Sequence, residues 1–311
     1  MLDDVTQTVI DTINQRHGTN NSFCDIAGTP NYFASVIDIN FGQHLATTTD
    51  GVGSKVDHII KHASNDIIGN DVFAMNINDL LCVGANPIGF QNHITTQKDQ
   101  AHIIPDVING ILEACSQSFV LLTGGETEVL KDTKFHISGS ACGIIADGCP
   151  IIDGSQVEVG DVIIGLESNG LHANGWTALA ERMPSDYIDE ANVLPTQLYG
   201  PDIHPLLTRI TPTAIINITG GGFRNLERIP KNFSYDIRYE NTQGIFADIA
   251  NMFNFSECYT TFNMGIGMMV IVRPEDVEIS VEMMKSSRVI GKVIEPINIH
   301  QEILVNGNPI V

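Results

Sequence analysis

Positive charge is scarce in this sequence. Its 311 residues contain 16 Lys and Arg against 37 Asp and Glu, which gives a formal net charge of −21. Because a surface this acidic repels nucleic acid and anionic lipid, we expect neither a nucleic acid nor a membrane as a partner. A phosphorylated ligand would have to be held by local devices, namely backbone amides, a few selected cations and a bound metal.

Long apolar runs and closely spaced cysteine pairs are also missing. No stretch approaches the roughly 20 apolar residues that a membrane-spanning helix needs, and the N-terminal segment carries early acids where a signal peptide has its apolar core. The six cysteines show no C-x-x-C spacing, and most have apolar neighbours, as reduced and buried thiols do. We therefore expect a cytoplasmic protein.

The common nucleotide-binding and hydrolase motifs are absent as well. The chain has no G-x-x-x-x-G-K-[ST] loop, no G-x-G-x-x-G after a strand, no H-E-x-x-H and no G-x-S-x-G. Any nucleotide must therefore be held in some way other than by a P-loop or a dinucleotide fingerprint.

Helix and strand patterns alternate along the whole chain. The predicted helices are residues 5–16, 66–83, 102–119 and 200–210. The predicted strands are two strands or a hairpin in 34–49, a buried strand ending in a turn in 119–128, and further strands in 136–145 and 260–272. Residues 162–180 and 213–229 each predict a strand, a glycine-rich loop and a helix.

A break rich in glycine and acidic residues lies at residues 146–162. We place a domain boundary there, between an N-terminal domain of residues 1–149 and a C-terminal domain of residues 150–311. Both halves alternate helices and strands, so the sequence predicts a two-domain α/β (α+β) protein.

The segment TDGVGSK puts a carboxylate at the predicted end of a strand. Asp50 is followed by Gly51, Gly53 and Lys55. A carboxylate beside open glycine backbone and a lysine suits magnesium and phosphate. An Asp-Gly turn is the commoner meaning of the dipeptide, and it stays open as an alternative.

Further carboxylates gather in the first half. Asp71, Asn78 and Asp79 share one face of the predicted helix and have no basic residue four positions away. Glu126 follows two glycines in TGGETE. A solvated polar face is the ordinary meaning of such a helix, but unpaired acids beside asparagine also fit a metal-bridged polyphosphate.

Two glycine-rich loops in the second half, SNGLHANG and ITGGGF, lie between a predicted strand and a predicted helix. Backbone N–H groups at a helix start bind phosphate without a lysine. Three consecutive glycines also indicate a ligand against bare backbone, although a flexible loop is an equal alternative. His172 is either a packed histidine or a catalyst. The loop residues concerned are Ser168, Asn169, Gly170, His172, Asn174, Thr219, Gly220, Gly221 and Gly222.

These motifs, in this order, resemble the phosphoribosylformylglycinamidine cyclo-ligase family of purine biosynthesis, also called aminoimidazole ribonucleotide synthetases. The match runs from about residue 45 to about residue 295. No single motif would suffice, but seven in one order are highly specific. The matching segments are TDGVGSK (49–55), IGNDVFAMNINDLLCVGANP (68–87), GGET (124–127), IIDGS (151–155), SNGLHANG (168–175), ITGGGF (218–223) and TFNMGIGM (261–268).

The resemblance implies a two-domain subunit whose first sheet joins that of its partner in a homodimer. It implies ATP-dependent ring closure of formylglycinamidine ribonucleotide: the formyl oxygen is phosphorylated, the amidine nitrogen attacks, phosphate leaves and the imidazole forms. The substrate phosphate would lie against the glycine loops of the second domain, at Ser168, Asn169, Gly170, Thr219, Gly220, Gly221 and Gly222.

The resemblance also implies roles for individual residues. ATP would contact Gly51, Gly53, Lys55, Asp71, Asn78, Asp79 and Glu126. Mg²⁺ would be held by Asp50, Asp79 and Glu126. The catalytic candidates are Asp50, His172, Asn174 and Asn217.

The sequence departs from the family pattern in three places. The family usually begins with a longer glycine- and aspartate-rich arm that contains a lysine, whereas FCDIAGTPNYFAS stands here in place of a glycine-rich stretch. The loop after GGET is shorter. Asn217 stands where the family commonly has a histidine, two residues before the Thr-Gly-Gly-Gly run. The first two departures concern ATP and the third concerns the chemical step.

Two other functions remain alternatives. One is another ATP-using enzyme of the same superfamily, such as thiamine monophosphate kinase or selenophosphate synthetase. The second of these is disfavoured because no reactive cysteine lies near a glycine-rich N-terminal loop. The other alternative is a non-catalytic homologue that binds nucleotide, which the presence of Asp50, Asp79, Glu126 and His172 argues against.

Overall fold

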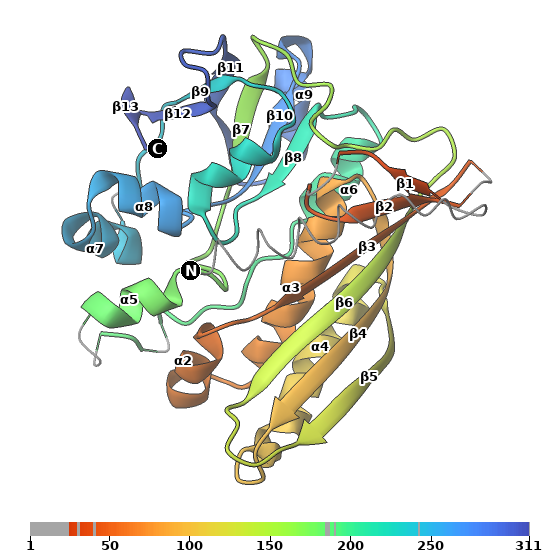
Figure 1. The fold of residues 1–311 in the computed structure, drawn as a ribbon, viewed down its shortest axis with the longest axis vertical. Helices are drawn as coiled ribbons and strands as arrows, with labels where there is room; N and C mark the ends of the chain where they lie inside the picture. The colour runs from red at the N-terminus through yellow and green to blue at the C-terminus, as the bar shows by residue number, and fades with distance from the viewer. Residues whose placement is uncertain are drawn as a thin grey trace.

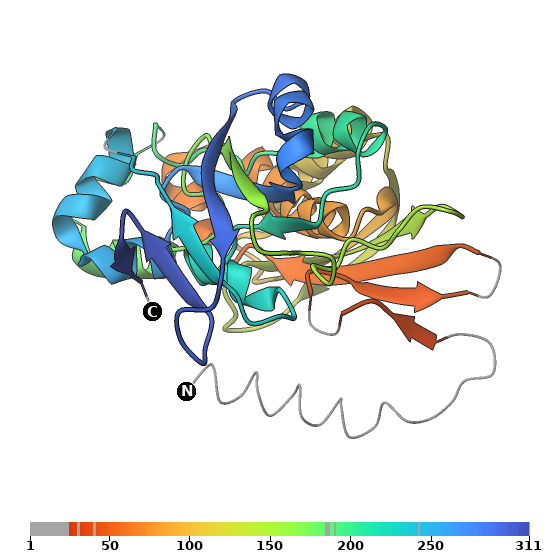
Figure 2. The same cartoon turned by 90° about the horizontal axis from the view of Figure 1, so that it is seen from above.

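Two β-sheets form the framework of the molecule, and helices pack against both (Figures 1 and 2). The computed structural model describes residues 25–29, 32–39, 42–183, 187–189, 191–241 and 243–310. The helix predicted at residues 5–16 lies outside the described residues. Within the described part of the chain, no helix combines the length and the apolar character that crossing a membrane requires.

The first sheet has six strands. In order across the sheet they are β1 (Asp25–Ala27), β2 (Ser35–Asp38), β3 (His44–Gly51), β6 (His136–Ile145), β4 (Asn86–Thr96) and β5 (Leu121–Val129). Neighbouring strands are antiparallel except for β4 and β5, which run parallel. The predicted hairpin is confirmed, since β2 and β3 pair with Asp38 opposite His44. The strand predicted at 136–145 is β6.

The strand predicted in residues 119–128 exists, but the prediction that it is buried and ends in a turn was wrong. β5 is an edge strand with most of its residues exposed, and it continues through TGGETE to Val129. Pairing with β4 places Gly125 opposite Asn92, and a Cβ atom on Gly125 would lie 2.7 Å from the Asn92 side-chain oxygen. Gly125 therefore allows close contact between β4 and β5. This contact outweighs the tendency of two adjacent glycines to form a turn.

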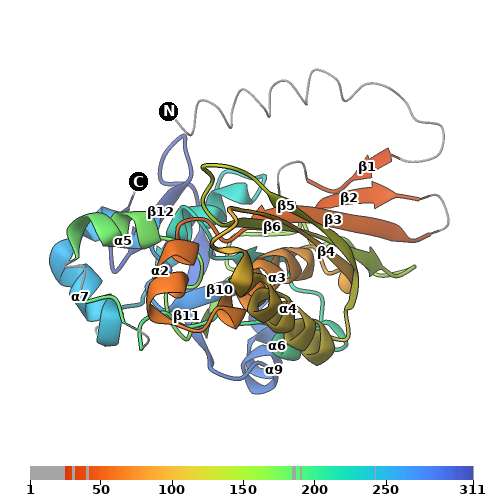
Figure 3. The same ribbon diagram turned by 90° about the horizontal axis from the view of Figure 1, so that it is seen from below.

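The helices of the first half are α2 (Lys55–His62), α3 (Asp66–Cys82) and α4 (Ile104–Ser118), and the last is entered through the 3-10 turn η1 (Ala101–Ile103). α3 and α4 lie against one face of the sheet (Figure 3). They cross closely, because a Cβ atom on Gly110 would lie 2.0 Å from the Asp66 carbonyl oxygen. Phe73 of α3 packs edge-on against Phe90 of β4. The predictions for both helices are confirmed.

The second sheet has seven strands. In order across the sheet they are β13 (Asn308–Pro309), β12 (Glu302–Val305), β9 (Ser234–Ile237), β11 (Ser287–Ile294), β7 (Val162–Glu167), β10 (Ile266–Val272) and β8 (Ala214–Asn217). β8 and β10 are buried along their whole length, which fits their unbroken apolar sequences.

The helical segments of the second half are α5 (Trp176–Arg182), α6 (Gly200–Leu207), η2 (Gly222–Arg228), α7 (Gly244–Met252), α8 (Phe255–Thr261), η3 (Pro274–Asp276) and α9 (Val277–Met283). Both predicted units of strand, glycine-rich loop and helix are confirmed, as β7 with α5 and as β8 with the 3-10 helix η2. α5 and α7 gather at the end of the molecule opposite β1 and β2 (Figures 1 and 3).

α3 is buried on every side, because it lies between the two halves of the chain. It contacts β3, β6 and α4 on one side and β8 and α6 on the other. Its polar residues, predicted to share a face, therefore meet the second half of the chain and do not face solvent. The domain boundary near residue 150 stays a prediction.

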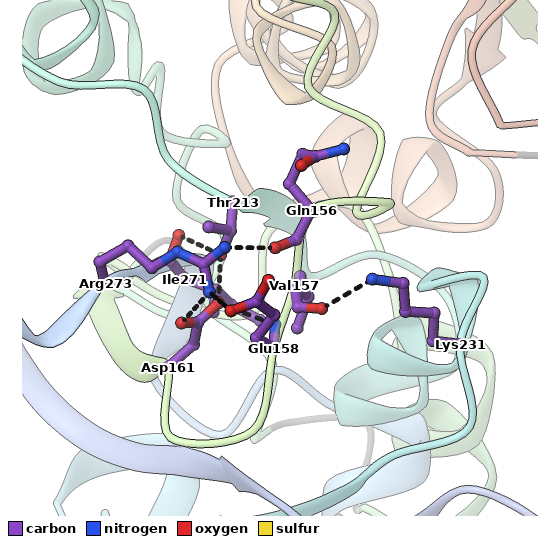
Figure 4. Close-up of polar contacts among 8 residues, drawn as sticks. All are labelled: Gln156, Val157, Glu158, Asp161, Thr213, Lys231, Ile271 and Arg273. Carbon is purple, nitrogen blue, oxygen red and sulfur yellow. Dashed lines mark hydrogen bonds and ion pairs between the residues drawn. The ribbon is translucent and has the colours of Figure 1, made fainter.

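A polar network centred on the buried Asp161 fixes the linker between the two sheets, which is the segment of residues 146–161 between β6 and β7 (Figure 4). The Asp161 carboxylate is 1% exposed and accepts from Thr213 Oγ1 at 2.9 Å and from the backbone N–H of Glu158 at 3.1 Å. The guanidinium of Arg273 donates to Asp161 at 2.9 Å and to the Gln156 carbonyl at 3.0 Å. Because Thr213 precedes β8 and Arg273 follows β10, the network ties the linker to one end of the second sheet.

Candidate functional site

Two carboxylates approach each other where α3 passes the end of β3. Asp50 is the penultimate residue of β3, and its backbone N–H donates to Asn76 Oδ1 of α3 at 3.0 Å. Asp79 lies almost one turn further along α3 and is 9% exposed. The two carboxylates are close enough for their charges to interact, and Arg228 at the end of η2 interacts with both.

Burial makes both carboxylates hard to ionise. It raises the pKa of Asp79 to about 7, while a hydrogen bond from Asn217 opposes the shift and the charge of Asp50 adds to it. Burial also raises the pKa of Asp50, against the opposing effects of the Gly51 N–H, 2.7 Å from Oδ1, and of Arg228. A cation beside the pair would offset both the burial and the repulsion.

The donor set of this pair fits Mg²⁺. Magnesium prefers hard oxygen ligands and is usually held by one or two carboxylates together with phosphate oxygens and water. Asp50 and Asp79 supply the carboxylates. Among the residues that the structure describes, no group of three His, Cys, Asp or Glu side chains could hold a metal alone. The remaining ligands would have to come from a bound polyphosphate.

Glu126, predicted as the third metal ligand, points to the opposite face of the first sheet. Asp50 pairs with Gly139 of β6, whereas Glu126 pairs with His93 of β4, which pairs in turn with Ser138 of β6. Since neighbouring residues on a strand point to opposite faces, Asp50 and Glu126 are separated by the sheet. Glu126 lines a shallow hollow on the open face. The structure does not bring it to Asp50 and Asp79 within one chain.

Lys55 and Asp71, predicted to contact ATP, form an ion pair inside the protein. Their charged atoms are 2.7 Å apart, and both side chains are 0% exposed. Asp71 also accepts from the backbone N–H of Thr196 at 2.6 Å. Asn78 is buried too and donates to the Gln197 carbonyl at 2.8 Å. The prediction that the acids of α3 lack a basic partner was wrong, because Lys55 comes from a separate helix and no local spacing reveals it.

Of the two glycines of the TDGVGSK loop, Gly53 remains open to approach, whereas a Cβ atom on Gly51 would lie 3.0 Å from the Ile137 carbonyl oxygen. Gly53 has a φ of 69°, and no atom lies within 4 Å of the position that its Cβ would take. The N–H of Gly51 is directed at Asp50. Bare backbone therefore adjoins the carboxylate pair, as a phosphate site requires.

His172 is packed into the protein. It is 3% exposed and has a φ of 60°, and its ring centre lies 6.0 Å from that of Tyr199 in a tilted arrangement. Burial, with Lys55 adding to the effect, lowers the pKa of His172 to about 3, so the ring is neutral near pH 7. His172 Nε2 and Asn174 Nδ2 are buried without a hydrogen-bond partner in the described residues. These two atoms are available to a ligand that reaches them.

The loop from Thr219 to Gly222 lies beside Asn174. A Cβ atom on Gly220 would be 3.3 Å from Asn174 Oδ1, and Gly221, with a φ of 97°, has open space around it. Gly222 differs, because its Cβ would lie 2.3 Å from the Tyr259 carbonyl oxygen. The third glycine is therefore explained by packing, and only the first two leave bare backbone for a ligand.

The other glycine-rich loop lines an open pocket with a volume of about 630 Å³. Its residues Ser168, Asn169 and Gly170 form one wall. The lining also includes Leu194, Tyr239, Asn241, Gln243 and Arg288. None of Thr219 to Gly222 is part of this lining. The residues predicted to bind one phosphate thus occupy two places, Ser168 to Gly170 in this pocket and Thr219 to Gly222 beside Asn174.

Asn217 faces Asp79 and is 2% exposed. Its Nδ2 donates to Asp79 Oδ1 at 2.8 Å. The residue therefore acts on the carboxylate pair.

Two residues of the site escaped the sequence analysis. Asn76 fixes the end of β3 through Asp50, and Arg228 is the cation that interacts with both acids. Arg228 follows the ITGGGF loop at the end of its helix, so a basic residue after a glycine loop was the available signal. Asn76 carried no signal, because its contact with Asp50 joins residues 26 positions apart in the sequence.

Both halves of the chain match family models. Residues 33–145 match the AIR synthase related protein, N-terminal domain, and residues 158–299 match the AIR synthase related protein, C-terminal domain. A phosphoribosylformylglycinamidine cyclo-ligase from Finegoldia magna is 36% identical over 262 residues, which cover 78% of this chain and 76% of the relative. One from Alkaliphilus oremlandii is 34% identical over 307 residues, covering 88% and 89%.

Solved structures share the fold at low sequence identity. A chain of a HypE–HypF complex superposes with a TM-score of 0.68 and 16% identity, covering 96% of each chain. The structure of AaThiL complexed with AMPPCP and TMP gives a TM-score of 0.67 and 14% identity, covering 96% of this chain and 92% of that one. The two-sheet architecture is therefore shared with proteins of low sequence identity.

Proposed function

Because this chain belongs to the phosphoribosylformylglycinamidine cyclo-ligase family, we propose that it converts formylglycinamidine ribonucleotide into 5-aminoimidazole ribonucleotide. ATP is consumed, and ADP and phosphate are released. The observation that carries the proposal is the pair of the half-buried Asp50 and the buried Asp79, two carboxylates with raised pKa values near the open backbone of Gly53. The ionised forms of these two carboxylates oppose folding unless a cation binds beside them. Mg²⁺-ATP supplies such a cation and requires carboxylate ligands of this kind.

Asp50 and Asp79 would hold Mg²⁺, which neutralises the polyphosphate when it is bound. The backbone of Gly53 would lie along the phosphates, while the N–H of Gly51 holds the Asp50 carboxylate. Asn217 keeps Asp79 turned toward Asp50 by its hydrogen bond at 2.8 Å. These residues align the terminal phosphoryl group with the formyl oxygen of the substrate, and alignment with charge neutralisation is the main requirement of phosphoryl transfer.

Ring closure follows phosphorylation of the formyl oxygen. The amidine nitrogen attacks the activated formyl carbon, the carbon–oxygen bond to phosphate breaks, and a proton passes to solvent. His172 and Asn174 are proposed to orient the substrate through their unpartnered nitrogens. A histidine with a pKa of about 3 is not a cationic acid near neutral pH, so orientation is the role that its environment supports.

The substrate phosphate is proposed to lie against the two glycine loops. Ser168 to Gly170 offer a wall of the large pocket, and Gly220 and Gly221 offer bare backbone beside Asn174. Such backbone amides suit a chain with a net charge of −21 and few cations.

A homodimer is part of the proposal. β5 is an exposed edge strand that carries the exposed side chains of Leu121 and Val129, and unpaired edges are templates for pairing with another chain. Glu126 on the open face would then be available to a partner. A cytoplasmic location is proposed too, and it is supported by the five free cysteines of the described residues.

The proposal is tested with purified protein, ATP, Mg²⁺ and formylglycinamidine ribonucleotide. We expect ADP and the imidazole product in equal amounts, and we expect Asp50→Asn to abolish both while the far-ultraviolet circular dichroism stays unchanged. ADP without the imidazole would point to a kinase of the same superfamily. Neither product would point to a homologue that only binds nucleotide.

A further inference from the structure

Residues 191–199, named the strap here, cross the polar side of α3 without forming a helix or a strand. Their backbone groups are bonded by side chains from other segments, which replace the missing secondary structure. The bonds are Lys55 Nζ to Leu194 O at 2.6 Å, Asn169 Nδ2 to Pro195 O at 2.9 Å, Thr196 N to Asp71 Oδ1 at 2.6 Å, Asn70 Nδ2 to Thr196 O at 2.8 Å and Asn78 Nδ2 to Gln197 O at 2.8 Å.

The ion pair of Lys55 and Asp71 is the centre of this set. The two residues bind each other, and each also forms a hydrogen bond with one backbone group of the strap. Both side chains are 0% exposed, so neither is placed to touch a ligand in this structure. Buried pairs are seldom retained for stability alone, since apolar replacements of both partners are often at least as stable. The pair therefore calls for a role in placing something else.

One thing that Lys55 places is a wall of the large pocket. Ala191, Asn192 and Leu194 of the strap line this pocket next to the SNGLHANG loop, since a Cβ atom on Gly170 would lie 3.7 Å from the Leu194 side chain. Lys55 binds the carbonyl of Leu194 itself. The position of this wall relative to the rest of the protein is thus set from the first half of the chain.

The second thing that Lys55 places is His172. The ammonium of Lys55 lies 5.8 Å from the centre of the Trp176 ring, which is a cation–π distance. The indole N–H of Trp176 donates to the His172 carbonyl at 2.7 Å. His172 has a φ of 60°, a left-handed conformation that a histidine adopts only when its surroundings hold it there.

We infer that Lys55, held by Asp71, is a positioning residue that sets the pocket wall at Leu194 and the backbone of His172, and that it does not contact ATP. The inference rests on the proposed function in taking this pocket as the substrate pocket. It assigns to the TDGVGSK lysine a role on the substrate side of the molecule, although its own loop adjoins the carboxylate pair.

The test is the double variant Lys55→Met with Asp71→Asn. A single substitution would leave one buried charge unpaired, which is strongly destabilising, whereas the double variant removes both charges at similar side-chain volume. Asn at position 71 can still accept from Thr196 N–H. The matched control is Lys134→Met with Asp57→Asn, which makes the same change at an exposed pair that is also 2.7 Å apart.

Three quantities are measured on each variant: the KM for formylglycinamidine ribonucleotide, the KM for ATP, and acrylamide quenching of tryptophan fluorescence. Trp176 is the single tryptophan of the chain and is 1% exposed, so its quenching reports whether the packing of Trp176 beside Lys55 is kept. We expect the double variant to raise the KM for the ribonucleotide by about tenfold, the factor for one lost hydrogen bond. The KM for ATP should stay the same, and quenching should increase.

The opposite pattern would overturn the inference. A raised KM for ATP with an unchanged KM for the ribonucleotide would make Lys55 an ATP contact. Wild-type values throughout, with unchanged quenching, would make the pair purely structural. If the wild type closes no ring, the proposed function fails, and quenching still decides whether Lys55 positions Trp176. Should the double variant not fold, Asn70→Ala loosens the same strap without burying a charge, and the same criteria apply to it.

Discussion

At the scale of single residues, Asp79 illustrates how a functional group can oppose folding. Its folded pKa of about 7 lies above the ordinary value of 3.8, because burial disfavours the charged form. A group with a raised folded pKa stabilises the fold below the lower value and loses that contribution as the pH rises through the upper one. The free protein should therefore lose stability between about pH 4 and pH 7.

The corresponding prediction is that Asp79→Asn raises the melting temperature at pH 8 and leaves it nearly unchanged at pH 4. The asparagine still accepts the hydrogen bond from Asn217, so packing is preserved. The same variant should lose ring closure, because it lacks the charge that a cation needs. Thermal unfolding at both pH values checks this, and an effect of equal size at pH 4 and pH 8 would contradict it.

Asn217 provides a second prediction at this scale. Asn217→Ala should lower activity, because Asp79 loses its donor. Asn217→His should change kcat by less than about tenfold, or about 1.4 kcal/mol of barrier, since a histidine can donate to the same carboxylate. If proton transfer were the missing function, the histidine would restore a factor in the range of roughly 10²–10⁴. Steady-state kinetics of the two variants distinguish these outcomes.

The three consecutive glycines give a third prediction, in which Gly221 and Gly222 act as a matched pair. Gly222→Ala should unfold at a clearly lower temperature than wild type, because its Cβ would lie 2.3 Å from a carbonyl oxygen. Gly221→Ala has open space and suffers only the strain of its positive φ, about 1–2 kcal/mol. It should instead raise the KM for the ribonucleotide. Equal loss of stability in both variants would contradict the division of roles.

At the scale of elements, local patterns predicted what a segment forms better than what it touches. The spacing of Phe73 and Ile77 predicted α3. The polar residues Asp71, Asn78 and Asp79 lie on this helix, as the sequence predicted. Their partners were not, because Asp71 bonds a backbone N–H 125 positions away. The edge position of β5 was missed for the same reason, since pairing with β4 decides it and the sequence of β5 does not.

The linker network gives a prediction at this scale. Asp161→Ala should lower the free energy of unfolding by about 1–3 kcal/mol, because the N–H of Glu158 and the guanidinium of Arg273 lose a buried acceptor. The KM values should not change, since the network lies at the linker and not at the carboxylate pair. Urea unfolding measures the effect. Lys134→Ala is the control, as its exposed ion pair should contribute little.

At the scale of the whole molecule, the candidate site depends on both halves of the chain. α3 lies between the sheets and brings Asp79 of the first half to Asn217 and Arg228 of the second. The family resemblance predicted Asp50 and Asp79, together with Glu126, as metal ligands. It could not show that Glu126 points away, since this depends on strand register across three pairings.

The central claim, that this protein closes the ring through phosphorylation of the formyl oxygen, is tested most directly with oxygen-18 in the formyl group of the substrate. The reaction is run with ATP and Mg²⁺, and the released inorganic phosphate is analysed by mass spectrometry. We expect one labelled oxygen in each phosphate released, and we expect labelled phosphate and imidazole product to form in equal amounts. Label that appears in water, with unlabelled phosphate, would contradict this claim.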